Sequence, residues 1–258
     1  MRRTTTPIWR FQVSQPSEAI PATHAHDEHG HGHNSLVAHH FCEIEQQHEA
    51  STLGMWVFLA TEVMFIGAIF IGFFSYRIDI NYFNAFEKGS ANLVTWIGAV
   101  NTAVLLTSSL TVVLAIHACK AGKQKQIVGY LIATWVLGWM FFGFKILEYK
   151  TDWDERLWPV LSNGDFRPVG EAPPGKPPWK DETERRHAAM FYRFYYSLTG
   201  LHAFHMLIGI GIFSVLIFRA IRGDYTPESH QQVEICGLYW HFVDLVWIFL
   251  FPLLYLIK

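Results

Sequence analysis

Five long blocks of apolar residues alternate along the chain with polar segments. The blocks lie at about residues 53–76, 93–119, 127–149, 191–218 and 233–257. An α-helix of about 20 residues crosses the hydrocarbon core of a bilayer, which is roughly 30 Å thick, and each block is longer than that. The pattern therefore predicts an all-α integral membrane protein, with five transmembrane helices in one bundle over residues 51–258.

Two polar segments lie outside the predicted helices. Residues 1–50 form a histidine-rich tail, and Ser51 or Thr52 is expected to cap the first helix. Residues 150–189 are rich in proline and carry charges of both signs, which predicts a long, irregular loop between the third and fourth helices. We expect the aromatic side chains of this loop to dock against a neighbouring protein or the membrane surface.

Composition narrows the classes of function. The chain is 51% hydrophobic and 16% charged, its formal net charge is −2, and no basic stripe is present, so nucleic-acid binding is not expected. The three cysteines form no CxxC pair and are interpreted as inert thiols. Five tail histidines could hold Cu²⁺ or Zn²⁺, but their irregular spacing favours a mobile tail with weak metal affinity. They are His24, His26, His29, His31 and His33.

The first apolar block contains one charged residue, Glu62, close to its middle. A carboxylate at that depth costs at least about 2.5–3.5 kcal/mol on insertion scales. Counted from Thr52, Glu62 lies roughly 15 Å from the inner end, and Asp244 lies at a similar depth in the fifth block. We expect the two carboxyls to share one buried site that exchanges protons through water or His241. A protonated, hydrogen-bonded structural acid is the alternative for each.

The remaining polar residues of the blocks favour packing over cofactor binding. A bis-histidine haem site needs imidazoles at matching depth, whereas His205 and His241 differ in depth by about 10 Å. We therefore expect the intramembrane histidines, His202 included, to be hydrogen-bonded within the bundle. The hydroxyls of residues 101–111 are expected to serve helix–helix contacts. Lys145 and Glu148 are spaced i, i+3, which predicts an interfacial ion pair.

The order of these polar residues resembles subunit III of the haem–copper terminal oxidases. The resemblance is carried by five segments in the family's order, and it leaves out the tail and the long loop. The segments are GMWVFLATEVMFIGAIF (54–70), NTAVLLTSSLTVVLA (101–115), GWMFFGFKILEY (138–149), SLTGLHAFHMLIG (197–209) and VEICGLYWHFVDLVWIFLF (233–251).

The resemblance implies a non-redox subunit without a catalytic centre of its own, in a complex that reduces dioxygen and translocates protons. It implies that haem and copper are held by partner subunits, that subunit I is the main contact, with subunit II and other respiratory subunits nearby, and that phospholipid is bound. Larger members have seven spans, and this chain is similar to the five-span form. Lys145 stands where the family leads us to expect glutamine. The family's polar bundle residues match Glu62, Glu148, His202, His205, Glu234, His241 and Asp244.

Two further functions stay open from the sequence. One is a subunit III-like component of nitric oxide reductase, and the other is a stand-alone intramembrane proton pathway. With the N-terminus in the cytoplasm and the C-terminus outside, the short inner loops carry most of the basic residues, as the positive-inside rule requires. The expected location is therefore a bacterial-type inner membrane. The basic residues of the inner loops are Lys120, Lys123, Lys125, Arg219 and Arg222.

Overall fold

The computed structural model describes residues 44–159, 166–225 and 230–256, which all belong to one compact unit. These residues form six α-helices and no strand. Five helices are long and apolar enough to cross a membrane, which confirms the predicted all-α bundle of five spans. The helices are α1 (Ile44–Ile78), α2 (Ile80–Asn92), α3 (Thr95–Lys120), α4 (Gln124–Asp154), α5 (Glu182–Arg222) and α6 (Gln231–Tyr255).

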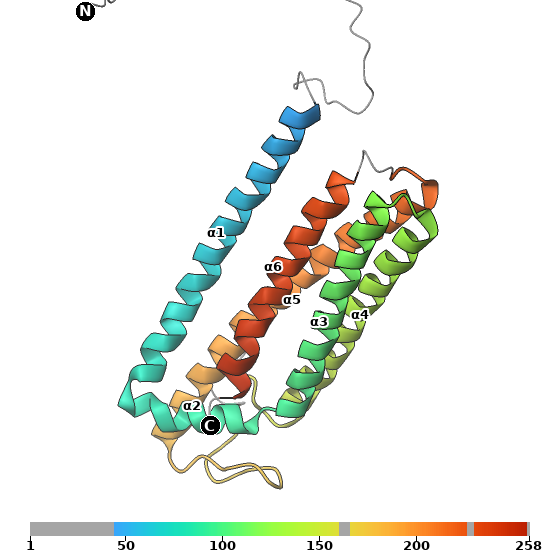
Figure 1. The fold of residues 1–258 in the computed structure, drawn as a ribbon. Coiled ribbons are helices and arrows are strands. Elements are labelled where there is room, and N and C mark those ends of the chain that lie inside the picture. Colours follow the sequence, from blue (N-terminus) through green and yellow to red (C-terminus); the bar gives the residue numbers. More distant parts are fainter. Residues whose placement is uncertain (1–43, 160–165, 226–229, 257–258) are drawn as a thin grey trace, which may run out of the picture. The chain divides into compact units, whose positions relative to one another are not determined.

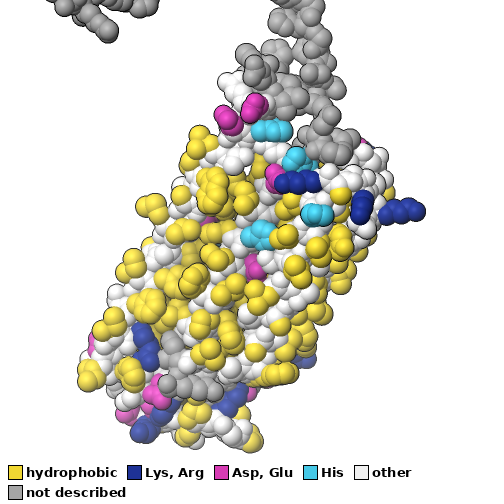
Figure 2. Space-filling model, in the orientation of Figure 1, with side chains coloured by type: hydrophobic (Ala, Val, Ile, Leu, Met, Phe, Trp, Pro, Cys, Tyr) yellow, Lys and Arg dark blue, Asp and Glu magenta, His cyan; other side chains and the backbone are white. Residues whose placement is uncertain are grey.

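The helices run up and down with short connections, except between α4 and α5 (Figure 1). Helices α3 and α4 lie side by side, and α5 and α6 lie between that pair and α1. Hydrophobic side chains cover the middle of the visible face, while charged side chains gather toward its two ends (Figure 2). This distribution is the one expected of helices that cross a bilayer, and the protein is a multi-pass membrane protein.

Helix α1 begins earlier than the sequence analysis expected. The side chains of Ser51 and Thr52 do not cap it but lie inside it, where they donate to the carbonyls of Gln47 and His48 at 2.8 and 2.9 Å. The preceding residues include glutamate, glutamine and alanine, which form helices well. The predicted cap is therefore wrong, because the edge of the apolar block is not the edge of the helix.

Helix α2 was not predicted. Its N-cap is Asp79, whose carboxylate accepts the Asn81 backbone N–H at 2.9 Å. The helix is amphipathic and packs on α5, where a Cβ at Gly89 would lie 2.5 Å from the Phe191 ring. Only glycine permits this close approach, and the approach lets the Tyr192 hydroxyl donate to the Gly89 carbonyl at 3.3 Å.

The polar connection between α4 and α5 is shorter than predicted, since α4 ends at Asp154 and α5 begins at Glu182. Asp181 caps α5 by accepting the Glu184 backbone N–H at 2.7 Å. Phe166 and Trp179 are buried and stack with their centroids 6.1 Å apart. Phe166 contacts the Tyr192 ring of α5, with centroids 5.8 Å apart, and Trp158 contacts the Tyr196 ring of α5 at 4.1 Å. Aromatic side chains of the loop thus pack within the chain itself.

Arg167 holds this loop to the rest of the protein. Its guanidinium donates to the Asn92 side chain at 2.9 Å and lies 4.9 Å from the centroid of the Trp179 ring. Glu155, which is ion-paired with Lys176 at 2.6 Å, lies 4.0 Å from the same guanidinium. Burial lowers the pKa of Arg167 from its ordinary value. Arginine nevertheless stays protonated in proteins, so a positive charge is fixed beneath the loop.

The core of the bundle is built around Trp240 of α6. Its ring fits between two glycines, where a Cβ at Gly209 would lie 2.9 Å, and one at Gly138 3.0 Å, from a ring atom. The indole N–H donates to the Ser108 hydroxyl at 3.0 Å, so the polar group of this buried ring has a hydrogen-bond partner. One tryptophan thereby joins α3, α4, α5 and α6.

Candidate functional site

Glu62 of α1 and His205 of α5 form a polar pair between these two helices. The His205 Nε2 lies 3.1 Å from the Glu62 Oε2, and the side chains are 11% and 19% exposed. The other ring nitrogen of His205 bonds the Leu201 carbonyl at 2.9 Å, which fixes the orientation of the imidazole. This carboxyl–imidazole contact between α1 and α5 can hold and exchange a proton. The sequence indicated both residues but not their pairing.

Asp244 and His241 lie one turn apart on α6, and they face α3. The His241 Nδ1 is hydrogen-bonded to the Ser109 hydroxyl at 2.6 Å. Asp244 is buried, and its Oδ1 has no hydrogen-bond partner among the described residues. The carboxyl of Glu62 instead meets the His205 ring at the α1 side of α5, so the hydrogen bonds do not join the two acids into the single site that we expected.

His202 has a different environment from the other two histidines. It is buried, and neither ring nitrogen has a hydrogen-bond partner in the described part of the chain. Its ring lies 5.5 Å from the Phe141 centroid and 5.0 Å from that of Trp247. The expectation that all three histidines are hydrogen-bonded in the bundle is confirmed for His205 and His241, and it is wrong for His202. The rings of Phe141 and Trp247 lie next to the His202 imidazole, where polar partners were expected.

The hydroxyls of α3 do serve helix–helix contacts, as predicted. Thr102 accepts the Trp247 indole N–H at 3.1 Å, and the Thr111 hydroxyl pairs with that of Thr134 at 2.7 Å. Together with the contacts of Ser108 and Ser109, these bonds join α3 to α4 and α6. Asn101 and Thr107 are exceptions. Asn101 is buried without a partner among the described residues, and the exposed Thr107 hydroxyl donates to the Ala103 carbonyl of its own helix at 2.8 Å.

Lys145 and Glu148 form the predicted ion pair, with Nζ and Oε2 2.7 Å apart. The pair is buried within the bundle, because the side chains are only 3% and 1% exposed. The Lys145 ammonium also donates to the hydroxyls of Tyr255 and Tyr195 at 3.0 and 3.3 Å. The Tyr255 hydroxyl in turn donates to the other Glu148 oxygen at 2.6 Å, so both carboxylate oxygens are bonded.

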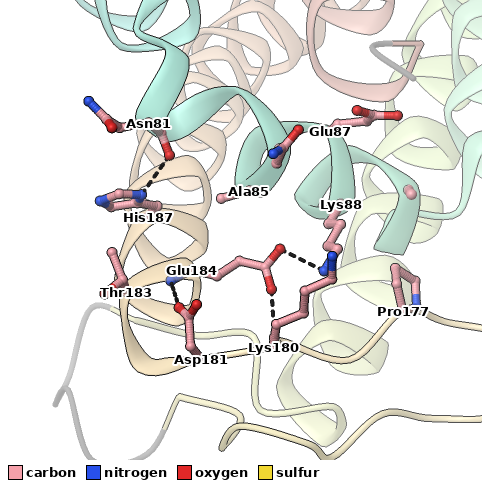
Figure 3. Close-up of a pocket in the computed structure, with 12 residues that line it drawn as sticks. Asn81, Ala85, Glu87, Lys88, Pro177, Lys180, Asp181, Thr183, Glu184 and His187 are labelled. Atoms are coloured by element: carbon pink, nitrogen blue, oxygen red, sulfur yellow. Dashed lines mark hydrogen bonds and ion pairs between the residues drawn. The ribbon is translucent and has the colours of Figure 1, made fainter.

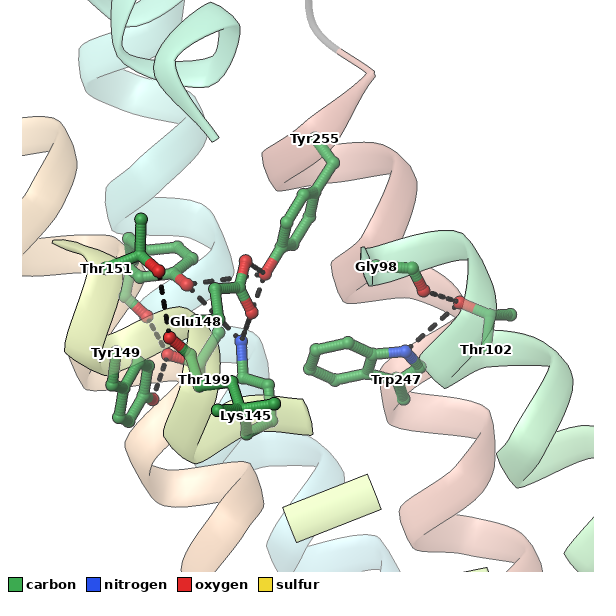
Figure 4. A network of polar contacts seen from close by, with 11 residues as sticks. Gly98, Thr102, Lys145, Glu148, Tyr149, Thr151, Thr199, Trp247 and Tyr255 are labelled. Carbon is green, nitrogen blue, oxygen red and sulfur yellow. Dashed lines mark hydrogen bonds and ion pairs between the residues drawn. The ribbon is translucent and has the colours of Figure 1, made fainter. Parts of the chain in front are cut away.

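Aromatic rings complete the surroundings of this buried pair (Figure 4). The Lys145 ammonium lies 5.1 Å from the Trp247 centroid and 5.1 Å from that of Tyr149, within the range of cation–π attraction. Tyr149 in turn bonds the Thr199 hydroxyl at 2.7 Å. The network ties α4 to α5 and α6, and it is a structural clamp with every charge compensated.

Glu234 belongs to the surface at the opposite end of the bundle. It pairs with Lys120 at 2.6 Å and lies 3.6 Å from His230, with its side chain 35% exposed. Exposed pairs of this kind contribute at most about 1 kcal/mol. The contact joins the end of α3 to the start of α6 and does not place Glu234 with the other candidate residues.

A polar pocket of 630 Å³ lies between α2 and the start of α5 (Figure 3). Its charged side chains are largely engaged with one another. Lys88 pairs with Glu184 at 2.6 Å, and His187 bonds the Asn81 carbonyl at 2.9 Å. Among the described residues, moreover, no group of three His, Cys, Asp or Glu side chains is placed to hold a metal ion. The tail histidines at 24–33 lie outside the described residues.

Comparison with known proteins gives a consistent family. The family model described as cytochrome c oxidase subunit III matches residues 33–153 and 187–258, leaving out the loop between α4 and α5. Cytochrome c oxidase subunit 3 of Alkalihalophilus pseudofirmus is 32% identical over 79% of this chain and 85% of its own length. The subunit 3 of Prototheca wickerhamii is 32% identical over 78% and 67%. A probable subunit 3 of Rickettsia felis is 29% identical over 83% and 72%. The chain therefore belongs to the cytochrome c oxidase subunit III family.

Proposed function

We propose that the chain is a non-redox accessory subunit of a haem–copper oxidase that reduces dioxygen and translocates protons. Membership of the subunit III family is the observation that carries this proposal. Haem and copper belong, in this account, to subunits I and II. The chain itself supplies a rigid bundle, a carboxyl–imidazole pair and apolar surfaces. A nitric oxide reductase component is the alternative, and the metal content of the partner distinguishes the two.

The contact with subunit I is proposed to involve α1. Over residues 45–78 of this helix, the buried residues are Leu59, Ile66 and Phe73, at intervals of seven, so α1 packs on the bundle along one narrow stripe. Large apolar side chains cover much of its remaining surface, including Trp56 and Met64 at 58% and 76% exposure. A second membrane protein can cover such a surface by close packing. For this reason α1 is proposed to form the interface.

Proton uptake is proposed to involve Glu62 and His205. The pair lies on the side of the bundle where α1 packs only narrowly, and neither side chain is fully enclosed. A partner that packs against α1 would therefore be close to a group that can accept and release protons. The buried Lys145–Glu148 pair is unsuited to this task, because both of its charges are already compensated.

Bound phospholipid is proposed to occupy a groove between α1 and α6. The groove has a volume of 340 Å³, and its lining is almost entirely apolar, as acyl chains require. Residues of both helices line it, among them Gly67, Phe70, Phe242 and Phe249. An acyl chain here would extend the narrow contact of α1 with the rest of the bundle.

The orientation is proposed to place the start of α1 in the cytoplasm and the C-terminus outside a bacterial-type inner membrane. The connections that lie at the same end as the start of α1 are α3–α4 and α5–α6 (Figure 1). They hold Lys123 and the basic ends of α3 and α5, including Lys120, Arg219 and Arg222. Basic residues concentrate in short cytoplasmic loops, which supports this orientation.

Glu62→Gln tests the proton role. Glutamine keeps the volume of the side chain and can still bond His205, so we expect normal insertion and assembly of the oxidase. It cannot release a proton, so we expect proton uptake by the purified complex to slow several-fold, as measured with a pH-sensitive dye during turnover. Glu49→Gln, which changes an exposed glutamate of the same helix, is the matched control.

Two results would count against the role of Glu62. Failure of the Glu62→Gln chain to assemble would mean that the charged carboxylate is structural. Proton uptake that equals that of the Glu49→Gln control would mean that the pair takes no part in proton transfer.

A further inference from the structure

Three polar side chains in the core of the bundle lack hydrogen-bond partners in the part of the chain that the structure describes. The unpartnered atoms are both ring nitrogens of His202, both polar atoms of the Asn101 amide, and the Asp244 Oδ1. The three residues are 2%, 0% and 4% exposed. A buried polar atom without a partner is costly, because it has given up its hydrogen bonds to bulk water. A ligand that restores these hydrogen bonds is therefore expected.

The three side chains belong to three helices and lie at one level of the bundle, which Trp247 of α6 marks. The Trp247 ring has its centroid 5.0 Å from that of His202 in α5. Its indole N–H donates to Thr102, which follows Asn101 in α3. Asp244 precedes Trp247 by three residues, so their side chains lie on the same side of α6. Polar groups of α3, α5 and α6 are thereby brought to the same layer, the Trp247 layer.

The groups in this layer cannot all bond one another directly. Phe141 of α4 packs edge-on against Trp247, with centroids 4.9 Å apart, and both residues are 0% exposed. Helices α4 and α6 each contact both α3 and α5, whereas α3 and α5 do not contact each other in the described part of the chain. Asn101 and His202 therefore approach the Phe141–Trp247 pair from opposite sides. A small ligand is needed to supply their hydrogen bonds.

The chemistry of these groups fits water. The Asn101 amide both donates and accepts, and a neutral His202 imidazole has one donor and one acceptor nitrogen. A buried water forms a few hydrogen bonds, as donor and acceptor at once, to groups of this kind. A metal ion is disfavoured, since no group of three His, Cys, Asp or Glu side chains among the described residues is placed to hold one. The packed rings of Phe141 and Trp247 likewise favour the smallest polar ligand.

We propose that ordered water molecules bind in the Trp247 layer and complete the hydrogen bonds of His202, Asn101 and Asp244. The site is distinct from the Glu62–His205 pair, whose hydrogen bonds are made within the chain. It does not depend on the oxidase function, because all of the unpartnered groups belong to this chain.

Hydroxyl-radical footprinting of the full chain in mild detergent tests the proposal. X-ray radiolysis converts a bound water into a hydroxyl radical, which oxidises the side chains next to it, and mass spectrometry locates the products. Phe141 and Trp247 are expected to be oxidised several-fold more than a matched pair without unpartnered neighbours, Phe213 and Trp240. The rings of this control pair also lie 4.9 Å apart, both residues are 1% exposed, and the Trp240 indole N–H is bonded to Ser108.

The double variant Asn101→Leu/His202→Phe tests which groups hold the water. The substitutions keep side chains of similar size but remove the polar atoms, so oxidation of Phe141 and Trp247 should fall to the level of the control pair. Thr107→Val is the matched control variant, because it removes an exposed hydroxyl of α3 that bonds only its own helix. It should leave the oxidation of Phe141 and Trp247 unchanged.

Two results would overturn the proposal. The first is oxidation of Phe141 and Trp247 no greater than that of Phe213 and Trp240 in the unsubstituted chain, which would show that the layer is dry. The second is undiminished oxidation in a folded Asn101→Leu/His202→Phe chain, which would show that other groups hold the water. The first comparison needs no substitution, so it decides the matter even should the double variant fail to fold.

Discussion

Replacing Lys145 by methionine is expected to destabilise the folded chain by about 3–5 kcal/mol, the usual cost of breaking a buried ion pair. Methionine fills much of the same volume, but it leaves the Glu148 carboxyl without its cationic partner in a site with 1% exposure. The Tyr255 hydroxyl remains as a donor to one carboxylate oxygen, and the other loses its partner. The loss should appear as a fall in Tm of about 10 °C, followed by circular dichroism of the purified chain.

The control for this change comes from the same helix. Lys150→Met removes an exposed lysine, and surface changes of this kind stay within about 0.5 kcal/mol. Adding Glu148→Gln to Lys145→Met removes the stranded charge and should restore much of the lost stability. Equal Tm values for Lys145→Met and Lys150→Met would show that the clamp does not hold the bundle together.

Trp240→Ala is expected to cost about 3–5 kcal/mol, because it opens a large cavity at the centre of the bundle. Trp240 is 1% exposed and is enclosed by Gly138 and Gly209. The two glycines have no side chains with which to fill the space, so the site cannot collapse easily. The indole N–H bond to Ser108 is lost as well.

Trp139→Ala is the matched control for this second change. Trp139 belongs to α4 and is 45% exposed, so its removal leaves no enclosed cavity. We expect Trp240→Ala to lower Tm by about 10 °C and Trp139→Ala to lower it much less. Similar shifts for both variants would mean that Trp240 is not the centre of packing that the structure indicates.

The helices were predictable from the sequence because apolar length alone identifies a membrane span. Their ends were less predictable. The polar residues before Ser51 belong to α1, because a helix can extend beyond the apolar residues that cross the membrane. Helix α2 was not predicted because its apolar residues, such as Ala85 and Phe86, are few and lie within a polar segment.

The polar contacts were predictable only when the partners lie close together in sequence. Lys145 and Glu148 share one helix face, so their pairing followed from spacing. Their burial did not, because it depends on Tyr195 and Tyr255, which lie 50 and 110 residues away from Lys145. Glu62 meets His205 across 143 residues. The depth of a residue, counted along its helix from the inner end, does not show toward which neighbouring helix its side chain points. Depth therefore could not identify His205 as the partner of Glu62.

The most direct test is to purify the tagged chain in mild detergent from its native membrane and to identify the attached proteins and metals. We expect a large membrane partner that contains haem and copper and reduces dioxygen. A partner with haem but no copper would favour nitric oxide reductase. Purification of the chain without any haem-containing partner would contradict the proposed function.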